Sequence, residues 1–161
     1  MRTRLIRAIV AGLLGTVAMN LMAYTAYPLV LGGVPLDLAA MLGGMLGDNW
    51  IAGLIADFTL GTLILPALYV SLFHGITLGR PPVRGMVWGS AVWLVGQAVV
   101  SPLAGGGFFS QWAGGIPVIV GSLIGMLIYG YSFGLVLDGP HPPAPVAQHG
   151  VDETFHIRRA G

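Results

Sequence analysis

The sequence predicts an all-α, polytopic membrane protein with four transmembrane helices. Hydrophobic residues make up 55% of the 161 residues and charged residues only 8%, with a mean hydropathy of +0.83. A soluble domain usually carries about 25% charged residues. No Asp, Glu, Lys or Arg occurs in residues 8–36, 58–79 or 85–137. Since a spanning helix needs about 20 apolar residues, we expect spans at about 5–30, 50–74, 84–104 and 115–137.

The first span follows Met-Arg-Thr-Arg-Leu-Ile-Arg, which resembles the basic start of a secretory signal. Its apolar stretch is longer than the roughly 7–15 residues of a signal peptide core. We therefore expect a retained signal-anchor helix, with cleavage near residues 23–26 as the alternative.

The segment that links the first two spans, "GGVPLDLAAMLGGMLGDNW", predicts a short amphipathic helix from Pro35 to Leu46. Its apolar residues recur with the spacing of one helical face: Val34, Leu38, Met41, Leu42, Met45 and Leu46. Pro35 suits a first helical turn and Asp37 suits the helix dipole there. Gly47 is a natural stop, and we expect the helix to lie at the membrane surface.

All basic residues are arginines, and they fall in three places that four spans would put on one side. They are Arg2, Arg4 and Arg7, then Arg80 and Arg84, then Arg158 and Arg159. The positive-inside rule makes that side cytoplasmic, so we expect both termini in the cytoplasm of a prokaryotic inner membrane. After the transmembrane domain, 1–138, four prolines in 140–145 predict an extended cytoplasmic tail, 139–161.

A faint internal repeat relates the two halves of the chain. Alignment of Arg7 with Arg84 sets "RAIVAG" over "RGMVWG" and puts Asn20 over Gln97. With three residues skipped, "PLVLGG" (28–33) meets "PLAGGG" (102–107). In the second helices, "LGTLILPALYVSLFHG" (60–75) lies over "IGMLIYGYSFGLVLDG" (124–139). A duplication would give two parallel helical hairpins related by an axis along the membrane normal.

Three polar residues are predicted to lie within the bilayer: Asp57, Asn20 and Gln97. A carboxylate in hydrocarbon costs about 2.5–3.5 kcal/mol on insertion scales, so it should face another helix. One reading is that the three residues join helices by hydrogen bonds, which average about 0.6 kcal/mol in membranes. The other is a proton or solute path, for which a single acid without a second acid, Lys or His at depth is a weak basis.

Glycines at four-residue spacing predict close contacts between helices, because small residues let two backbones approach. The expected packing positions are Gly12, Gly53, Gly61, Gly85, Gly89, Gly121 and Gly125. Asp57 shares its helical stripe with two of them.

The sequence contains few residue patterns that are typical of catalytic, metal-binding or nucleic-acid-binding sites. Cysteine is absent, and the net charge of +1 gives no basic patch for nucleic acid. The histidines show no metal-ligand spacing, and Met19, Met22, Met41 and Met45 form an incomplete set for copper. No nucleophile–base pair, P-loop or dinucleotide fingerprint occurs. We therefore expect no enzymatic activity, no metal and no cofactor.

The chain resembles a family of small, uncharacterised four-helix membrane proteins of bacteria and archaea. The resemblance lies in "IRAIVAGLLGTVAMN", "PLDLAAMLGGMLGDNW" and "RGMVWGSAVWLVGQAVVSPL" and covers about residues 5–138. Members of that family often carry a His in the second and fourth spans, where this chain has Asp57 and Met126 nearby. The resemblance implies no established activity, and some members look associated with respiratory oxidase genes.

These observations favour a non-catalytic accessory subunit of a larger membrane complex, and the resemblance implies a respiratory, oxidase-type complex as the host. Its expected partners are larger membrane subunits and lipid. The alternative is a small homo-oligomeric transporter or channel with a path through Asp57, Asn20 and Gln97.

Overall fold

The computed structural model describes residues 2–31, 33, 35–72 and 79–138. Within them, four helices are long and apolar enough to cross a membrane: Arg4–Leu29, Trp50–Leu72, Pro81–Leu103 and Ile116–Leu137. The predicted all-α fold with four spans is therefore confirmed. The third span begins at Pro81 rather than near residue 84, because proline suits the first turn of a helix. The predicted tail lies outside the described residues.

Three of the spans are divided by a π-helical segment. The first consists of α1 (Arg2–Leu21), η1 (Met22–Ala26) and α2 (Tyr27–Leu31). The second consists of α4 (Trp50–Thr59), η2 (Leu60–Ile64) and α5 (Leu65–Leu72), and the third of α6 (Pro81–Val95), η3 (Gly96–Val100) and α7 (Ser101–Leu103). The 3₁₀ turn η4 (Phe108–Ser110) leads to the fourth span, the uninterrupted α8 (Ile116–Asp138).

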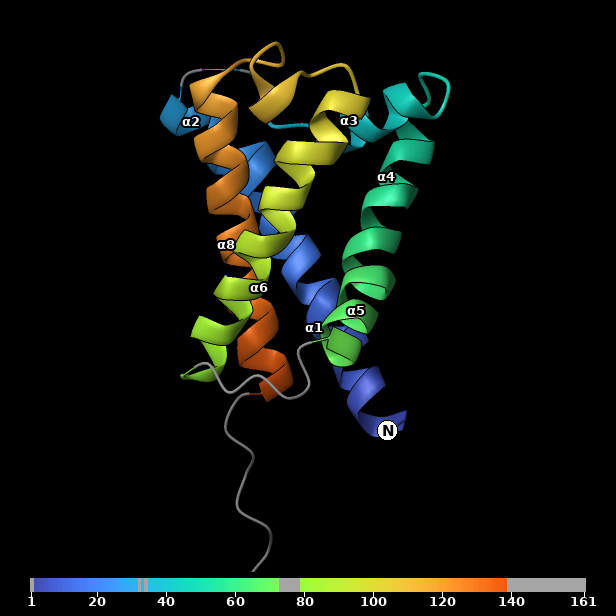
Figure 1. The fold of residues 1–161 in the computed structure, drawn as a ribbon, viewed down its shortest axis with the longest axis vertical. Helices are drawn as coiled ribbons and strands as arrows, with labels where there is room; N and C mark the ends of the chain where they lie inside the picture. Colours follow the sequence, from blue (N-terminus) through green and yellow to red (C-terminus); the bar gives the residue numbers. More distant parts are fainter. Residues whose placement is uncertain (1, 32, 34, 73–78, 139–161) are drawn as a thin grey trace, which may run out of the picture.

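The spans pack in the order α6, α8, α1 and α5, with α1 also against η2. The chain's N-terminus and the start of α6 lie at one end, here called the arginine end, and the short helix α3 (Leu38–Met45) lies at the other, the α3 end (Figure 1). The buried core lies toward the arginine end. There the ring of Tyr69 makes edge contacts with Trp88 and Phe133, at centroid distances of 5.7 and 5.0 Å.

Each π-helical segment ends two residues before a proline. The pairs are η1 with Pro28, η2 with Pro66 and η3 with Pro102. Proline has no N–H, and its ring collides with the carbonyl four residues earlier in a regular α-helix. A widened turn relieves that collision, and π-helical turns in proteins are mostly such single-turn insertions. The three prolines therefore account for the three π-helical segments.

These π–proline units leave carbonyl groups without a donor from their own helix. In η1, Tyr27 N–H donates to Met22 O, and the next carbonyl, Ala23 O, faces Pro28. Leu36 N–H, outside the helix, donates to Ala23 O at 3.3 Å. Because a buried unpaired carbonyl is costly, each such group needs a donor from elsewhere in the fold.

In η2 the freed carbonyl is that of Gly61, which faces Pro66 in the same way. The donor is Tyr129 of α8, whose hydroxyl lies 2.8 Å from Gly61 O. The second span is thus tied to the fourth at the point where its own hydrogen bonding is interrupted.

The helix expected from Pro35 to Leu46 is shorter than predicted. The helix α3 begins at Leu38, because Asp37 is its N-cap and accepts a hydrogen bond from Ala40 N–H at 2.8 Å. One side of the helix is buried against the protein. Ala39, Leu42 and Gly43 are buried, whereas Met45 and Leu46 are exposed. The buried side packs on α4, and the predicted apolar face at the membrane surface stays a prediction.

The two hairpins pack in corresponding ways. A Cβ at Gly12 would meet Gly61 O and Pro66 Cγ, and one at Gly89 would meet Met126 O and Gly130 Cα. Under the alignment of the halves, Gly12 corresponds to Gly89 and Pro66 to Gly130. With the three-residue skip, Pro28 corresponds to Pro102, and a π-helical segment ends two residues before each of these prolines. The carbonyls do not correspond, because Gly61 aligns with Gly125 and not with Met126, so the duplication stays a prediction.

Candidate functional site

The first polar cluster joins the first and second spans. Asn20 of α1 donates from Nδ2 to Asp57 Oδ2 at 2.8 Å and to the carbonyl of Thr16 at 3.0 Å. Thr16 is fully buried and donates to Gly12 O at 2.9 Å. Asp57 is only 3% exposed. The acid therefore faces a neighbouring span and not lipid, which lowers the cost of placing it in the membrane.

The second polar cluster joins the third span to α8 and to the loop between them. Gln97 lies in η3 and is 6% exposed. Its Nε2 donates to Ser122 Oγ at 3.0 Å, and its Oε1 accepts from Ser110 Oγ at 2.8 Å. Trp93 Nε1 also donates to Ser122 Oγ, at 3.0 Å. Ser101 completes the cluster, with its hydroxyl 3.1 Å from that of Ser110.

The second cluster includes a turn with an unfavourable backbone conformation. Phe109 and Ser110 both have φ near +52°, a conformation that non-glycine residues rarely adopt. This turn directs Ser110 inward to Gln97 and Ser101, while Phe108 and Trp112 remain exposed. The hydrogen bonds of Ser110 offset the strain of the turn.

The structure brings two of the three predicted polar residues together. Asn20 and Asp57 share a hydrogen bond, whereas Gln97 bonds to Ser110 and Ser122 in the other hairpin. The two clusters resemble each other. In each hairpin, a side-chain amide of the first span (Asn20 or Gln97) donates to a polar side chain of the second span (Asp57 or Ser122). The hydrogen bonds of both clusters hold neighbouring helices in a fixed position relative to each other.

A third group of polar residues, centred on Asp37, lies at the α3 end. Tyr24 in η1 donates its hydroxyl to Asp37 Oδ1 at 2.7 Å, and the indole of Trp50 donates to Asp37 Oδ2 at 3.0 Å. Partial burial is the largest influence on the pKa of Asp37 and raises it. The bonds from Tyr24, Ala40 N–H and Trp50 outweigh that effect, so the pKa of Asp37 lies below the ordinary aspartate value.

Sequence reasoning missed the role of Tyr24. Thr16, Asn20 and Tyr24 recur at four-residue spacing, which places them along one side of the first span. Gly12 precedes Thr16 by the same spacing, so this stripe predicts that Tyr24 lies beside the polar residues, but the structure alone identifies Asp37 as its partner. Ser110 and Ser122 gave no signal, because isolated serines are common in membrane helices and loops.

The predicted packing glycines all lie at close approaches. A Cβ at Gly85 would collide with Gly130 O, and one at Gly121 with the ring of Tyr27. A Cβ at Gly125 would meet Met19 and Met22 at 3.2 Å. Gly53 differs from the other six, because its neighbour is α3 rather than another span.

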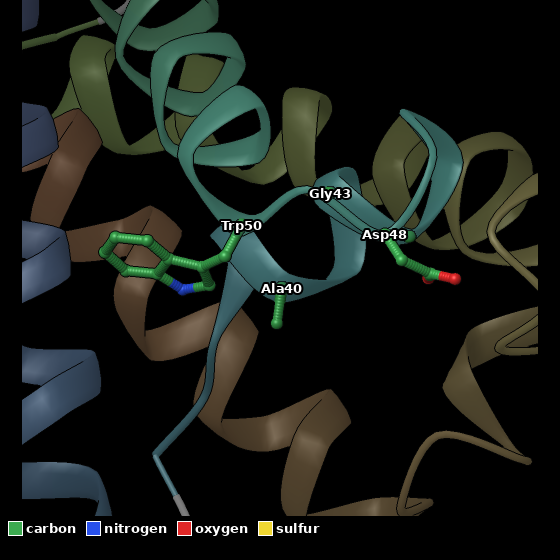
Figure 2. Close-up of a pocket in the computed structure, with 5 residues that line it drawn as sticks. Ala40, Gly43, Asp48 and Trp50 are labelled. Atoms are coloured by element: carbon green, nitrogen blue, oxygen red, sulfur yellow. The ribbon is translucent and has the colours of Figure 1, made fainter.

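Figure 2 shows a shallow depression beside α3 and α4, lined by Ala40, Gly43, Gly44, Asp48 and Trp50. Its volume is about 230 Å³, below the roughly 300–1,000 Å³ of small-molecule pockets. The Trp50 ring and the Asp48 carboxylate lie on opposite sides and point apart (Figure 2). Among the described residues, no group of three or more His, Cys, Asp or Glu could hold a metal ion.

The fold and these contacts define a four-span helical membrane protein whose spans are joined by buried polar side chains. A family model, "Family of unknown function (DUF6789)", matches residues 2–144, and the chain belongs to that family. No curated protein and no solved structure matches the chain.

Proposed function

We propose that the protein is a non-catalytic subunit that packs against larger subunits of a membrane complex. The observation that carries this proposal is the bond between Asn20 and Asp57, which uses the buried acid to hold two spans together. Interhelical hydrogen bonds of this kind stabilise membrane bundles. A respiratory complex of the oxidase type is the host that the resemblance described above suggests, and larger membrane subunits and lipid are the partners.

The proposal places the protein in the cytoplasmic membrane of a prokaryote, with the arginine end inside. Its support is the distribution of charge, because Arg80 precedes the third span and Arg84 lies near the start of that span, while Asp37 and Asp48 lie at the α3 end. The apolar surface is broad: Ile6, Leu21, Ile51, Leu72 and Val95 are all exposed. Lipid or partner helices would cover these side chains.

A homo-oligomeric transporter or channel remains the second candidate, and one observation favours it. Thr16, Asn20 and Tyr24 recur at four-residue spacing along the first span, and Tyr24 donates to Asp37, so polar side chains recur from the first cluster to the α3 end. Toward the arginine end, that route meets the aromatic layer of Tyr129, Phe133 and Tyr69. Gln97, the third residue of the suggested path, belongs to the other cluster.

Purification in a mild detergent distinguishes the two functions. Larger membrane subunits that co-purify in fixed ratio are the expected result. A homo-oligomer of this chain alone would contradict the accessory-subunit proposal and favour the transporter.

A further inference from the structure

The helices α3 and α4 form one compact unit, here called the arm (residues 37–59). A Cβ at Gly53 would collide with the carbonyl of Ala39, and one at Gly43 with the backbone of Asn49. Asn49 N–H donates to Gly43 O at 3.3 Å, and its side chain caps α4 through Ala52 N–H. These backbone contacts leave little freedom between the two helices.

The arm touches the first span far less than the rest of the second span does. Below the arm, Gly12 packs on Gly61 and Pro66. Above that point α1 and α4 diverge toward the α3 end, as Figure 1 shows, and few residues of the two helices are close. Close packing against the first span therefore holds η2 and α5, the half of the second span nearer the arginine end. The arm must be held against the first span by other contacts.

Two side-chain hydrogen bonds, here called the ties, connect the arm to the first span. Asn20 donates to Asp57 at 2.8 Å, and Tyr24 donates to Asp37 at 2.7 Å. Both donors lie on the first span, four residues apart, and both acceptors lie on the arm. Closure of the arm thus depends on these two ties and on the backbone hydrogen bond from Leu36 N–H, directly before the arm, to Ala23 O.

The lower boundary of the arm is η2, where the helix is widened and Pro66 removes a backbone hydrogen bond. Helices bend sharply at prolines and π-helical turns. The backbone at this boundary is anchored, because Tyr129 of α8 holds Gly61 O. A change of angle at η2 would move the arm while the lower half of the span stays in place.

We propose that the arm is a hinged element of the fold, which turns about η2 and is held closed against the first span by the two ties. The arm is rigid within itself, so its opening separates α4 from α1 at the α3 end. Opening removes Asp57 from its partner Asn20 and exposes that carboxyl group to its surroundings.

Distances between spin labels in the full-length protein, reconstituted in lipid nanodiscs, test this hinge. The chain has no cysteine, so label sites are introduced directly. One pair, Leu21→Cys with Met45→Cys, joins α1 to the arm at exposed positions. The control pair, Met45→Cys with Ile55→Cys, lies within the arm.

In the Asn20→Ala, Tyr24→Phe double variant, a longer distance should gain population for the first pair. Interhelical hydrogen bonds in membranes average about threefold in equilibrium constant, so both ties together predict about a tenfold increase. The distance within the arm should stay unchanged. An unchanged first pair, or a change within the arm, overturns the proposal.

Two further variants keep the test decisive. Tyr24→Phe alone removes a single hydroxyl, and about a threefold increase is expected from it. Pro66→Ala restores the N–H that η2 lacks and should lower the open population of the double variant. If Pro66→Ala leaves that population unchanged, the hinge is not at η2.

Discussion

The hydroxyl of Tyr129 donates a 2.8 Å hydrogen bond to the carbonyl oxygen of Gly61, joining the fourth span to the second. This carbonyl is available because Pro66 cannot donate to it. A side chain thus replaces a missing backbone bond between helices that are far apart in sequence.

Tyr129→Phe should destabilise the fold by about 1–3 kcal/mol, because it leaves a buried carbonyl without a donor. The free energy of unfolding in detergent measures the effect. Tyr131→Phe is the matched control, since Tyr131 lies on the same helix but is 48% exposed. Equal effects of the two changes would show that the Tyr129 bond contributes nothing specific.

If the protein is the proposed subunit, Asp57→Asn should leave assembly and activity of its complex nearly intact, within about 1 kcal/mol, because an amide oxygen still accepts from Asn20. Asp57→Leu should cost about 1–3 kcal/mol, because the Asn20 amide loses one of its two acceptors. The ratio of activity to assembled protein is the quantity to compare. A collapse of that ratio in Asp57→Asn at normal assembly would favour proton transfer.

Gly85→Ala should destabilise the bundle, whereas Gly96→Ala should be neutral or stabilising. A Cβ at Gly85 would collide with the carbonyl of Gly130, while nothing lies within 4 Å of a Cβ at Gly96. Alanine is otherwise favoured over glycine in a helix by about 1 kcal/mol. Thermal unfolding of the two variants in one detergent provides the comparison, and the same sign for both would contradict the packing described above.

Stability should fall in acid through Asp37. Its pKa in the folded protein lies below the ordinary value of about 3.9, so ionised Asp37 stabilises the fold above that pH. The contribution should disappear as pH falls from about 4 through the lower folded pKa. The difference in unfolding free energy between the wild type and Asp37→Asn should shrink over this range. A difference independent of pH would show that the charge of Asp37 is irrelevant.

Thiol labelling of intact cells tests the orientation. Cysteines at Asp48 and Gln111, which are exposed at or near the α3 end, should react with an impermeant reagent, and one at Gly150 in the tail should not. The reason is the arginine distribution. Reaction at Gly150 from outside would invert the orientation given to the arginine end.

The four spans could be predicted because uncharged runs of sufficient length have few alternatives to a membrane helix. The hydrogen bond between Asn20 and Asp57 could be predicted only in part. The Gly53–Asp57–Gly61 stripe indicated that the acid faces a helix, but not which one. The start of α3 was misjudged because Pro35 was placed in the first turn, whereas the side chain of Asp37 caps the helix.

The π-helical segments were not predicted, although the prolines that cause them are plain in the sequence. A proline predicts an irregularity but not its form, since a kink without a widened turn also relieves the collision. The donors to Ala23 and Gly61 come from segments distant in sequence, and only the folded arrangement identifies them.

The Tyr129–Gly61 bond has a consequence for the order of biosynthesis. A ribosome completes the second span well before it reaches Tyr129, and N-terminal parts of a chain generally fold first. During that interval the Gly61 carbonyl lacks its final donor. We therefore expect the first hairpin to enter the membrane before it is fully bonded, and the last span to supply the missing donor.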